Sequence, residues 1–531
     1  MSASTNHLRA LAIAATTIFG AACTSTTTPI DDDSDTELDI DTGAGIDHPV
    51  YVPEDQSVGH APDMATNEND DAPMISVADD EAAALLDDAA SEPADDVADW
   101  VNNPVDDSDE GGEEGDETNE ELADLAGSLS NTVTSEDNTP TGTSTTSIPT
   151  KIRYVLVIVK ENRTFDNYFT GFPGADTATW AYKWNPKTKK DEHFKRPFAP
   201  DGTLPTGPGH SHAKALAAYR DGHMDGFSVN AGMTPYMRYH ERQIPSYWKY
   251  AREYVLADHY FSTTLAPSSP GHEVFWFSRS TTLDNGTCHL PGGTGCGHGC
   301  EATHEVVTTF NPTTGVEHKV KPCFDLPSLP DHLPTGFDWI DYGGQMAKQI
   351  KSQQHVSASH YASTERLLTD MKGGKLHNLM IAHVSSGKFS EHPPEGPCQG
   401  ERFTVDVINA AMKLPQWNEM AVVVTWDDWG GFYDHVKPKV TRAKDRRRFG
   451  NGFRLPLMVI SPYAKKGFVL KHHTEQASVP RLVEELWGMK MMSTRNAHAR
   501  DGTAGSLMNA FDFKQSPRAP TILPRGSCPG D

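Results

Sequence analysis

Lysine and arginine are missing from a long stretch of the chain: neither occurs between Arg9 and Lys151. The part of this stretch from Asp31 to Asp137 holds 36 of the 73 acidic residues and is otherwise rich in Ser, Thr, Ala and Pro. Such a composition cannot bury enough apolar surface to offset the entropy of the chain, which excludes a packed domain. We therefore expect residues 23–150 to form a disordered acidic linker.

The net charge of −27 describes this linker rather than the rest of the protein. From Lys151 onward the chain carries 45 of the 46 lysines and arginines against 37 acidic residues, so this part is mildly basic. A basic surface suits an anionic substrate. We expect no nucleic-acid partner.

Long apolar runs are also missing, because no segment after residue 22 could span a bilayer as a helix. The apolar stretch Leu8–Ala22 has the character of a signal peptide, residues 1–22. It ends in small residues before Cys23, as in the lipid-attachment motif of exported bacterial proteins. We expect export and a lipid anchor at Cys23 in the cell envelope, at the outer membrane or cell surface. Ordinary cleavage and secretion is the alternative, because Gly20 stands where Leu is usual.

Cysteine is scarce as well, with only six after Cys23: Cys288, Cys296, Cys300, Cys323, Cys398 and Cys528. An even number in an exported protein predicts disulfides, with the pairing left open. A zinc site is the alternative, since the segment 288–300 also contains His289 and His298. The oxidising compartment and the glycine-rich segment favour disulfides.

Short apolar runs rich in β-branched residues predict strands that are buried on both faces. They lie at 152–159, 379–384, 421–426 and 456–461. Helical patterns lie between them, as at 403–414 and 478–489. This alternation predicts an α/β fold with a mostly parallel sheet covered on both faces, in a catalytic domain spanning 151–531. The stretch from about 284 to 332, rich in Gly, Pro and Cys, is expected to be an insertion.

Acidic turns follow two of the predicted strands. Glu161 and Asn162 follow the first strand, and Asp427 and Asp428 follow the run 421–426. Ligands of parallel sheets bind beyond the carboxyl ends of the strands, so the two turns could share one hard cation. Helix capping or solvated loop charge is the alternative for either turn alone.

A third element is the segment 265–272, which precedes an apolar helical run. Ser269 followed by Pro270 is a good helix start, so a serine that only caps the helix is the plain explanation. A hydroxyl before a helix N-terminus also lies where backbone N–H groups hold phosphate. A metal there would lower its pKa and make Ser268 a nucleophile.

The segment KENRTFDNYFTGFPG (160–174) resembles the opening motif of the phosphoesterase family that contains bacterial phospholipases C and acid phosphatases. This family belongs to the alkaline-phosphatase-like superfamily. Four further blocks are similar to it in the same order: 209–227, 265–275, 426–438 and 452–469. The resemblance implies a three-layer α/β/α sandwich resembling alkaline phosphatase.

The resemblance also implies roles for single residues. The implied metal ligands are Glu161, Asn162, Ser268, Asp427 and Asp428, and the implied catalytic residues are Ser268, His210, His392 and, as a weaker match, His360. Two-metal relatives place a histidine after the metal aspartate, where this chain has Asp428. One divalent ion, Ca, Mg, Mn or Fe, is therefore favoured over a dizinc centre. The chain departs from the family at Gly271, where Asn is frequent, and at Glu391, where Asp is usual.

The expected activity is metal-dependent hydrolysis of phosphate esters through a phosphoserine intermediate. Phospholipase C-type cleavage of a phosphodiester is favoured, which makes phospholipid a candidate substrate. An acid phosphatase acting on monoesters is the alternative. An inactive surface-binding protein on the same fold is a third hypothesis, which the presence of Glu161, Ser268, Asp427 and Asp428 speaks against.

Overall fold

The structure is a computed structural model that describes residues 149–229, 231–290, 295–310, 316–344, 346–439 and 450–528. All of these residues belong to one compact unit. The expected signal peptide, Cys23 and all but the last two residues of the expected linker lie outside the described residues.

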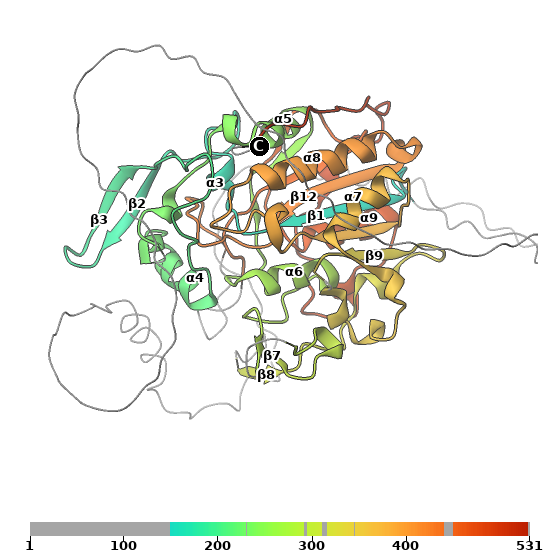
Figure 1. Cartoon of the computed structure of the whole chain (residues 1–531), viewed down its shortest axis with the longest axis horizontal. Coiled ribbons are helices and arrows are strands. Elements are labelled where there is room, and N and C mark those ends of the chain that lie inside the picture. The colour runs from blue at the N-terminus through green and yellow to red at the C-terminus, as the bar shows by residue number, and fades with distance from the viewer. Residues whose placement is uncertain are drawn as a thin grey trace, which may run out of the picture. The chain divides into compact units, whose positions relative to one another are not determined.

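An eight-stranded mixed sheet forms the centre, in the order β10-β9-β11-β1-β12-β13-β4-β14 (Figure 1). Its strands are β1 Tyr154–Lys160, β4 Val255–Ala257, β9 Trp339–Tyr342, β10 Tyr361–Ala362, β11 Leu379–His383, β12 Met420–Trp426, β13 Leu457–Ile460 and β14 Phe468–Leu470. All neighbours are parallel except that β13 runs antiparallel to both β12 and β4. The four runs predicted as strands form β1, β11, β12 and β13.

Two groups of helices cover the sheet. Helices α5 Pro245–Glu253, α7 Thr364–Lys372 and α8 Cys398–Met412 pack together, and α6 Ser268–Phe277 packs against α9 Ser478–Trp487. Figure 1 shows α8 and α6 on opposite sides of β1 and β12. Every residue of β12 is buried, as a sheet covered on both faces requires. The predicted three-layer α/β/α sandwich is confirmed.

Smaller elements surround this core. Strands β6 Thr287–Cys288, β7 Glu305–Phe310 and β8 Glu317–Val320 form a small sheet inside the expected insertion. Strand β5 Tyr260–Phe261 pairs with β15 Thr474–Glu475. The remaining labelled elements used below are α3 Phe165–Tyr168, α4 His212–Tyr219, β2 Trp180–Asn185 and β3 Lys190–Lys195.

The six cysteines after Cys23 form three disulfides: Cys288–Cys296, Cys300–Cys323 and Cys398–Cys528. The expectation of disulfides rather than a zinc site is confirmed, because no thiol of these six is left to bind a metal. Among the residues that the structure describes, no helix combines the length and the apolar character needed to cross a bilayer.

Candidate active site

The two acidic turns meet because β1 and β12 are adjacent parallel strands whose ends, Lys160 and Trp426, are in register. The backbone N–H of Asn162 donates to Asp427 Oδ1 at 2.7 Å. The approach is so close that a Cβ at Gly430 would lie 2.4 Å from the carbonyl oxygen of Asn162. Only glycine fits there, and it also adopts the positive φ of 57° that this turn requires.

Ser268 is the first residue of α6 and points at both turns. Its Oγ lies 3.2 Å from Glu161 Oε2, 3.2 Å from Asp428 Oδ2 and 3.5 Å from the side-chain amide of Asn162. Ser269 is engaged elsewhere, since its backbone N–H donates to Asn285 Oδ1. The structure thus brings Ser268, rather than Ser269, to the predicted ligands.

Helix α6 can reach this position because of Gly271. A Cβ at Gly271 would lie 2.1 Å from the carbonyl oxygen of Asp427, closer than any side chain could be accommodated. The departure from the family pattern at this position therefore has a steric cause: the helix carrying Ser268 lies directly against the turn carrying Asp427.

Three carboxylates are buried together at the site. Burial raises the pKa of Glu161 to about 7. Burial, with the charge of Glu161, also raises the pKa of Asp427 to about 7 and holds that of Asp428 well above its usual range. The buried Lys160 is adjacent but forms an ion pair with Glu391 at 3.2 Å. The site therefore has more negative than positive charge, and Asp427 Oδ2 makes no hydrogen bond. These features fit a bound divalent cation.

His272 lies one helical turn beyond Ser268 and is a site residue that the sequence interpretation missed. Its Nε2 is 2.9 Å from Glu161 Oε1 and 3.6 Å from Asp427 Oδ2. Ligand atoms of these three residues lie within 4.8 Å of one another, so they could hold a metal ion. The expected ligand set contained oxygen atoms only, whereas His272 would offer a nitrogen ligand.

The hydrogen-bond partners of His272 decide which of its nitrogens carries the proton. Trp276 Nε1 can only donate, and it donates to His383 Nε2 at 3.0 Å. His383 is buried, which holds its pKa well below the usual range, so its single proton is on Nδ1. That nitrogen lies 2.9 Å from His272 Nδ1, which must accept. The proton of His272 is therefore on Nε2, directed at Glu161, and in this arrangement the imidazole orients a carboxylate instead of ligating metal.

His210 and His392 flank the other side of the site, with ring centres 5.8 Å apart. His392 Nδ1 lies 2.6 Å from the Pro393 carbonyl oxygen. When the amide of Asn162 is oriented to donate to Asp428, its oxygen accepts from His392 Nε2 at 2.9 Å. In the opposite orientation, which a metal bound to the Asn162 oxygen would require, the amide nitrogen faces His392 Nε2 instead.

His210 has a different environment. Its Nδ1 donates to the Pro208 carbonyl at 3.1 Å, and its Nε2 lies 3.9 Å from Asp428 Oδ2. Burial lowers the pKa of His210. A neutral ring with its proton on Nδ1 leaves a lone pair on Nε2 beside the site.

A family model described as the Phosphoesterase family matches residues 152–490, a range that contains every residue of this site. The chain belongs to the phosphoesterase family. It is a hydrolase that acts on ester bonds.

Named relatives of this phosphoesterase include plant and bacterial enzymes. It is 26% identical over 423 residues to non-specific phospholipase C1 of Arabidopsis thaliana, covering 70% of this chain and 74% of that protein. It is 24% identical over 438 residues to phospholipase C A of Mycobacterium tuberculosis, covering 70% and 79%. A solved protein of the alkaline phosphatase superfamily from Vibrio parahaemolyticus aligns with 64% of this chain and 68% of its own, at 9% identity and a TM-score of 0.27.

The structure does not bring His360 to the site of the phosphoesterase. His360 ends a short 3₁₀ turn beside the edge strand β10, where its Nδ1 lies 2.7 Å from the Trp339 carbonyl oxygen. Its ring packs against the Trp339 ring at a centroid distance of 4.5 Å. These contacts place it at the rim of the sheet, away from β1 and β12.

Glu391 is a buried carboxylate that anchors the loop carrying His392. It is fully buried, accepts hydrogen bonds from the hydroxyls of Tyr168 and Tyr247 at 2.6 Å each, and pairs with Lys160. Its neighbour in sequence is His392. The second departure from the family pattern is thus a buried anchor, and it fixes the loop that presents His392.

A second buried cluster joins the same two turns but needs no metal. His435 Nδ1 lies 2.6 Å from Asp166 Oδ2, and Arg454 pairs with Asp166 at 3.2 Å and with Asp434 at 3.0 Å. Arg454 and His435, whose pKa is raised to about 9, together balance the charge of these two carboxylates. All four residues lie inside three of the motif blocks, so the motifs encode the scaffold of the turns as well as the site.

Proposed function

We propose that this phosphoesterase cleaves phospholipid phosphodiesters in the manner of a phospholipase C, with Ser268 as the nucleophile and one divalent metal ion as cofactor. The observation that carries the proposal is the position of Ser268 Oγ, which lies 3.2 Å from carboxylates on two different turns. A serine that only capped α6 would not need three buried carboxylates around it. The phospholipase C names of the relatives support the substrate class.

We assign the metal to the oxygen atoms of Glu161, Asn162, Ser268, Asp427 and Asp428. Bound there, a divalent cation would lower the pKa of the serine hydroxyl and offset charge that develops on the phosphate oxygens. An oxygen-only set suits Mg, Ca, Mn or Fe better than a dizinc centre.

The reaction we propose has two displacements at phosphorus. Ser268 Oγ, whose proton has passed to solvent on ionisation, attacks phosphorus while the bond from phosphorus to the glycerol oxygen breaks, which releases diacylglycerol and leaves a phosphoserine diester. His392 is our candidate for protonating the leaving oxygen, because its ring lies beside Asn162 and His210 at the site. Water then attacks phosphorus, the Oγ–P bond breaks with Oγ leaving in its ionised form, and the phosphorylated head group departs. His210 Nε2 is our candidate acceptor for the proton of that water, which then returns to His392.

The proposal is tested with p-nitrophenyl phosphorylcholine against p-nitrophenyl phosphate, each with and without chelator. We expect hydrolysis of the diester analogue, lost with chelator and restored by one metal. Preference for the monoester would instead support the acid phosphatase alternative, and no turnover of either would support the inactive-relative hypothesis.

The matched variants are Ser268→Ala and Ser269→Ala. The first should lower turnover by several orders of magnitude and abolish covalent capture of phosphorus. The second should keep near-normal activity, because the contacts with Glu161 and Asp428 are made by the hydroxyl of Ser268 and none is found for that of Ser269 among the described residues. Near-normal activity of Ser268→Ala would remove the nucleophile assignment.

We further propose that the enzyme is exported and lipid-anchored at Cys23, and that the acidic linker 23–150 is a dispensable spacer. Cys23 and all but the last two residues of the linker lie outside the described residues. A chain beginning at Thr145 should keep its turnover on soluble esters and leave the membrane fraction. An insoluble or inactive shortened chain would show instead that the linker is part of the fold.

A further inference from the structure

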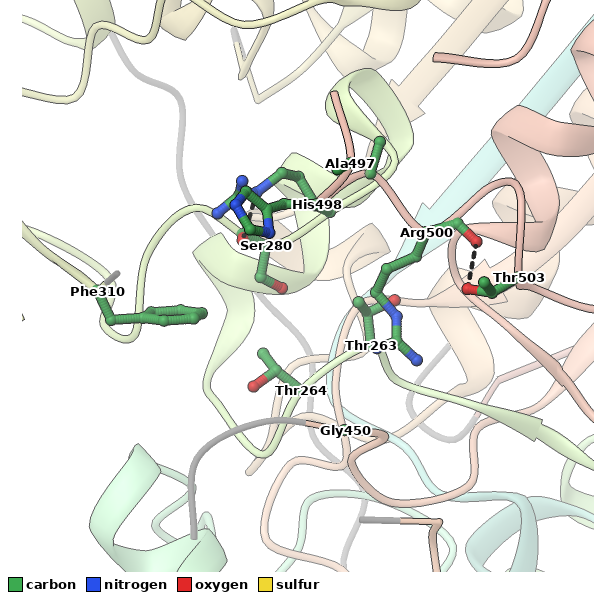
Figure 2. A pocket seen from close by; sticks show the side chains of 11 residues that line it. Thr263, Thr264, Ser280, Phe310, Gly450, Ala497, His498, Arg500 and Thr503 are labelled. Atoms are coloured by element: carbon green, nitrogen blue, oxygen red, sulfur yellow. Dashed lines mark hydrogen bonds between the residues drawn. The ribbon is translucent and has the colours of Figure 1, made fainter. Parts of the chain in front are cut away.

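A polar pocket of about 260 Å³ lies beside α6, lined by none of the residues assigned to the active site (Figure 2). Its polar lining is Thr263, Thr264, Arg279, Ser280, His498, Arg500 and Thr503, and no described carboxylate is part of it. It adjoins the nucleophile turn, because Ser280 Oγ donates to the Pro270 carbonyl oxygen at 2.9 Å.

The two arginines of this pocket differ in whether a carboxylate forms an ion pair with them. Arg500 pairs with the buried Glu475 at 2.8 Å, so its charge is largely compensated. The hydrogen bond of Arg279 goes from Nε to the carbonyl of its neighbour Ser280 at 3.3 Å, and no described carboxylate forms an ion pair with it. The nearest opposing charge is that of the buried Glu273, whose oxygens already accept from Thr281 and Thr282, so an anion in the pocket would stabilise the guanidinium further.

We infer that this pocket binds a phosphate group, with Arg279 as its principal ligand. The planar guanidinium suits phosphate oxygens, and the hydroxyl of Thr264 in the lining can donate a further hydrogen bond. Figure 2 shows Thr264, Ser280, His498 and Arg500 around one hollow, with Phe310 as an apolar wall. The phosphate is either a second phosphate on the substrate head group, in which case the inference rests on the proposed function, or free phosphate.

Calorimetric titration of the full, chelator-treated chain with inorganic phosphate tests the pocket without any need for activity. We expect binding that Arg279→Gln weakens at least about tenfold, the loss expected for a charge-assisted hydrogen-bond pair. The control is Arg495→Gln, which changes an arginine close in sequence to the lining residues His498 and Arg500 but not part of the pocket. This variant should bind phosphate like the wild type. Equal phosphate binding by wild type and Arg279→Gln would overturn the inference.

Kinetics on soluble short-chain phospholipids separate the two sources. A head-group source predicts that Arg279→Gln raises KM for a phosphorylated inositol head group, but not for choline, with kcat unchanged. Arg279-dependent phosphate binding without this discrimination assigns the pocket to free phosphate. Failure of the wild type to cleave any diester would count against the proposed function alone, since the titration still decides the pocket.

A different surface carries a second, independent inference. The hairpin of β2 and β3 projects from the body of the molecule (Figure 1). Trp180 is 48% exposed and Tyr182 is 50% exposed, and the ring of His193 stacks between them at centroid distances of 5.0 and 4.6 Å. The opposite face of the hairpin packs against the protein through Ala181 and Phe194.

The charges of this hairpin have one dominant sign. Lys183 pairs with Glu192 at 2.9 Å. Four exposed lysines form no ion pair with any residue that the structure describes: Lys187, Lys189 and Lys190 at the tip, and Lys195 at the base opposite Trp180. An exposed aromatic stack is therefore bordered by unpaired positive charge.

We propose that this hairpin docks on a lipid bilayer that contains anionic lipids. Tryptophan and tyrosine favour the interface between water and hydrocarbon, where one end of the ring is apolar and the other wet. Lysines near an anionic leaflet are attracted to it within a Debye length. The hairpin brings an enzyme with the proposed activity to the surface where its substrate lies.

Co-sedimentation with phosphatidylcholine vesicles, with and without phosphatidylglycerol, tests the docking surface. The full chain should carry Cys23→Ser, so that a lipid on that cysteine cannot mask the result. Changing Lys187, Lys189 and Lys190 to Gln should weaken binding to anionic vesicles about fivefold per lysine, the equivalent of about 1 kcal/mol each. Trp180→Ser with Tyr182→Ser should weaken binding to both kinds of vesicle.

Both sets of variants should hydrolyse a soluble ester at the wild-type rate, which separates docking from catalysis. Unchanged vesicle binding in both sets would overturn the proposal. Vesicle binding without lipid cleavage would leave the docking surface intact and count against the proposed function.

Discussion

Replacing His272 by Leu tests how the protein holds its metal. The hydrogen bonds from Trp276 through His383 put the proton of His272 on Nε2, which lies 2.9 Å from Glu161 Oε1. At the proposed metal site the imidazole would act through Glu161 and would not be a ligand itself. Loss of such an orienting hydrogen bond lowers metal affinity about 10–100-fold. This corresponds to about 1.4–2.7 kcal/mol.

The measurement is activity on a soluble diester against free Mn²⁺ in a metal buffer. The Mn²⁺ concentration for half-maximal activity should rise by that factor in His272→Leu, with turnover at saturating Mn²⁺ within a few fold of wild type. His210→Ala is the matched control: it should lower turnover and leave the half-saturating concentration unchanged. Pulsed EPR of the Mn²⁺ protein should detect no directly bound nitrogen. A bound nitrogen that disappears in His272→Leu would refute the proton assignment.

Three further predictions concern the scaffold of the site. Burial opposes the charged form of His435, but hydrogen bonding to Asp166 outweighs it and raises the pKa to about 9 from 6.5. Protonated His435 therefore stabilises the folded state fully below pH 6.5, and this stabilisation is lost as the pH rises through about 9. The difference in urea unfolding free energy between wild type and His435→Gln should therefore shrink by at most about 3 kcal/mol over this range, and a pH-independent difference would contradict it. Gly271→Ala should lower the unfolding free energy by about 1–3 kcal/mol and reduce turnover, because its Cβ would overlap the Asp427 carbonyl. Circular dichroism checks that the variant is folded, and kinetics measure the loss of turnover. Cys398→Ser opens a disulfide with a sequence separation of 130 and should lower the unfolding free energy by about 4–5 kcal/mol, seen as a lower melting temperature under non-reducing conditions.

The four middle strands of the central sheet, β11, β1, β12 and β13, were predictable because they are short runs of β-branched residues bounded by polar turns. The outer strands β9, β10 and β14, of two to four residues, were not predicted. The convergence of Glu161, Asn162, Asp427 and Asp428 followed from one rule, that the carboxyl ends of neighbouring parallel strands share an edge. That β1 and β12 are neighbours is shown by their register, and the sequence did not predict this strand order. The antiparallel direction of β13 left no mark in its sequence, because a fully buried strand is apolar in either direction.

Side-chain networks were harder to predict. His272 could have been found from its spacing, since a histidine four residues after Ser268 lies on the same face of a helix. The contacts of Asp166 with His435 and Arg454 join segments far apart in the chain, and no local pattern reports them. His360 matched a motif in sequence, yet its position depends on where an edge strand attaches, which a single sequence does not reveal.

The place of β1 in the sheet has a consequence for the order of events during synthesis. Its two partners, β11 and β12, begin only at Leu379 and Met420, so the first strand to be made waits for about the last two-fifths of the domain. Pairings between such distant segments form slowly. A growing chain therefore contains Glu161 and Asn162 for most of its synthesis before it has an active site. The active site forms only when β12 pairs with β1.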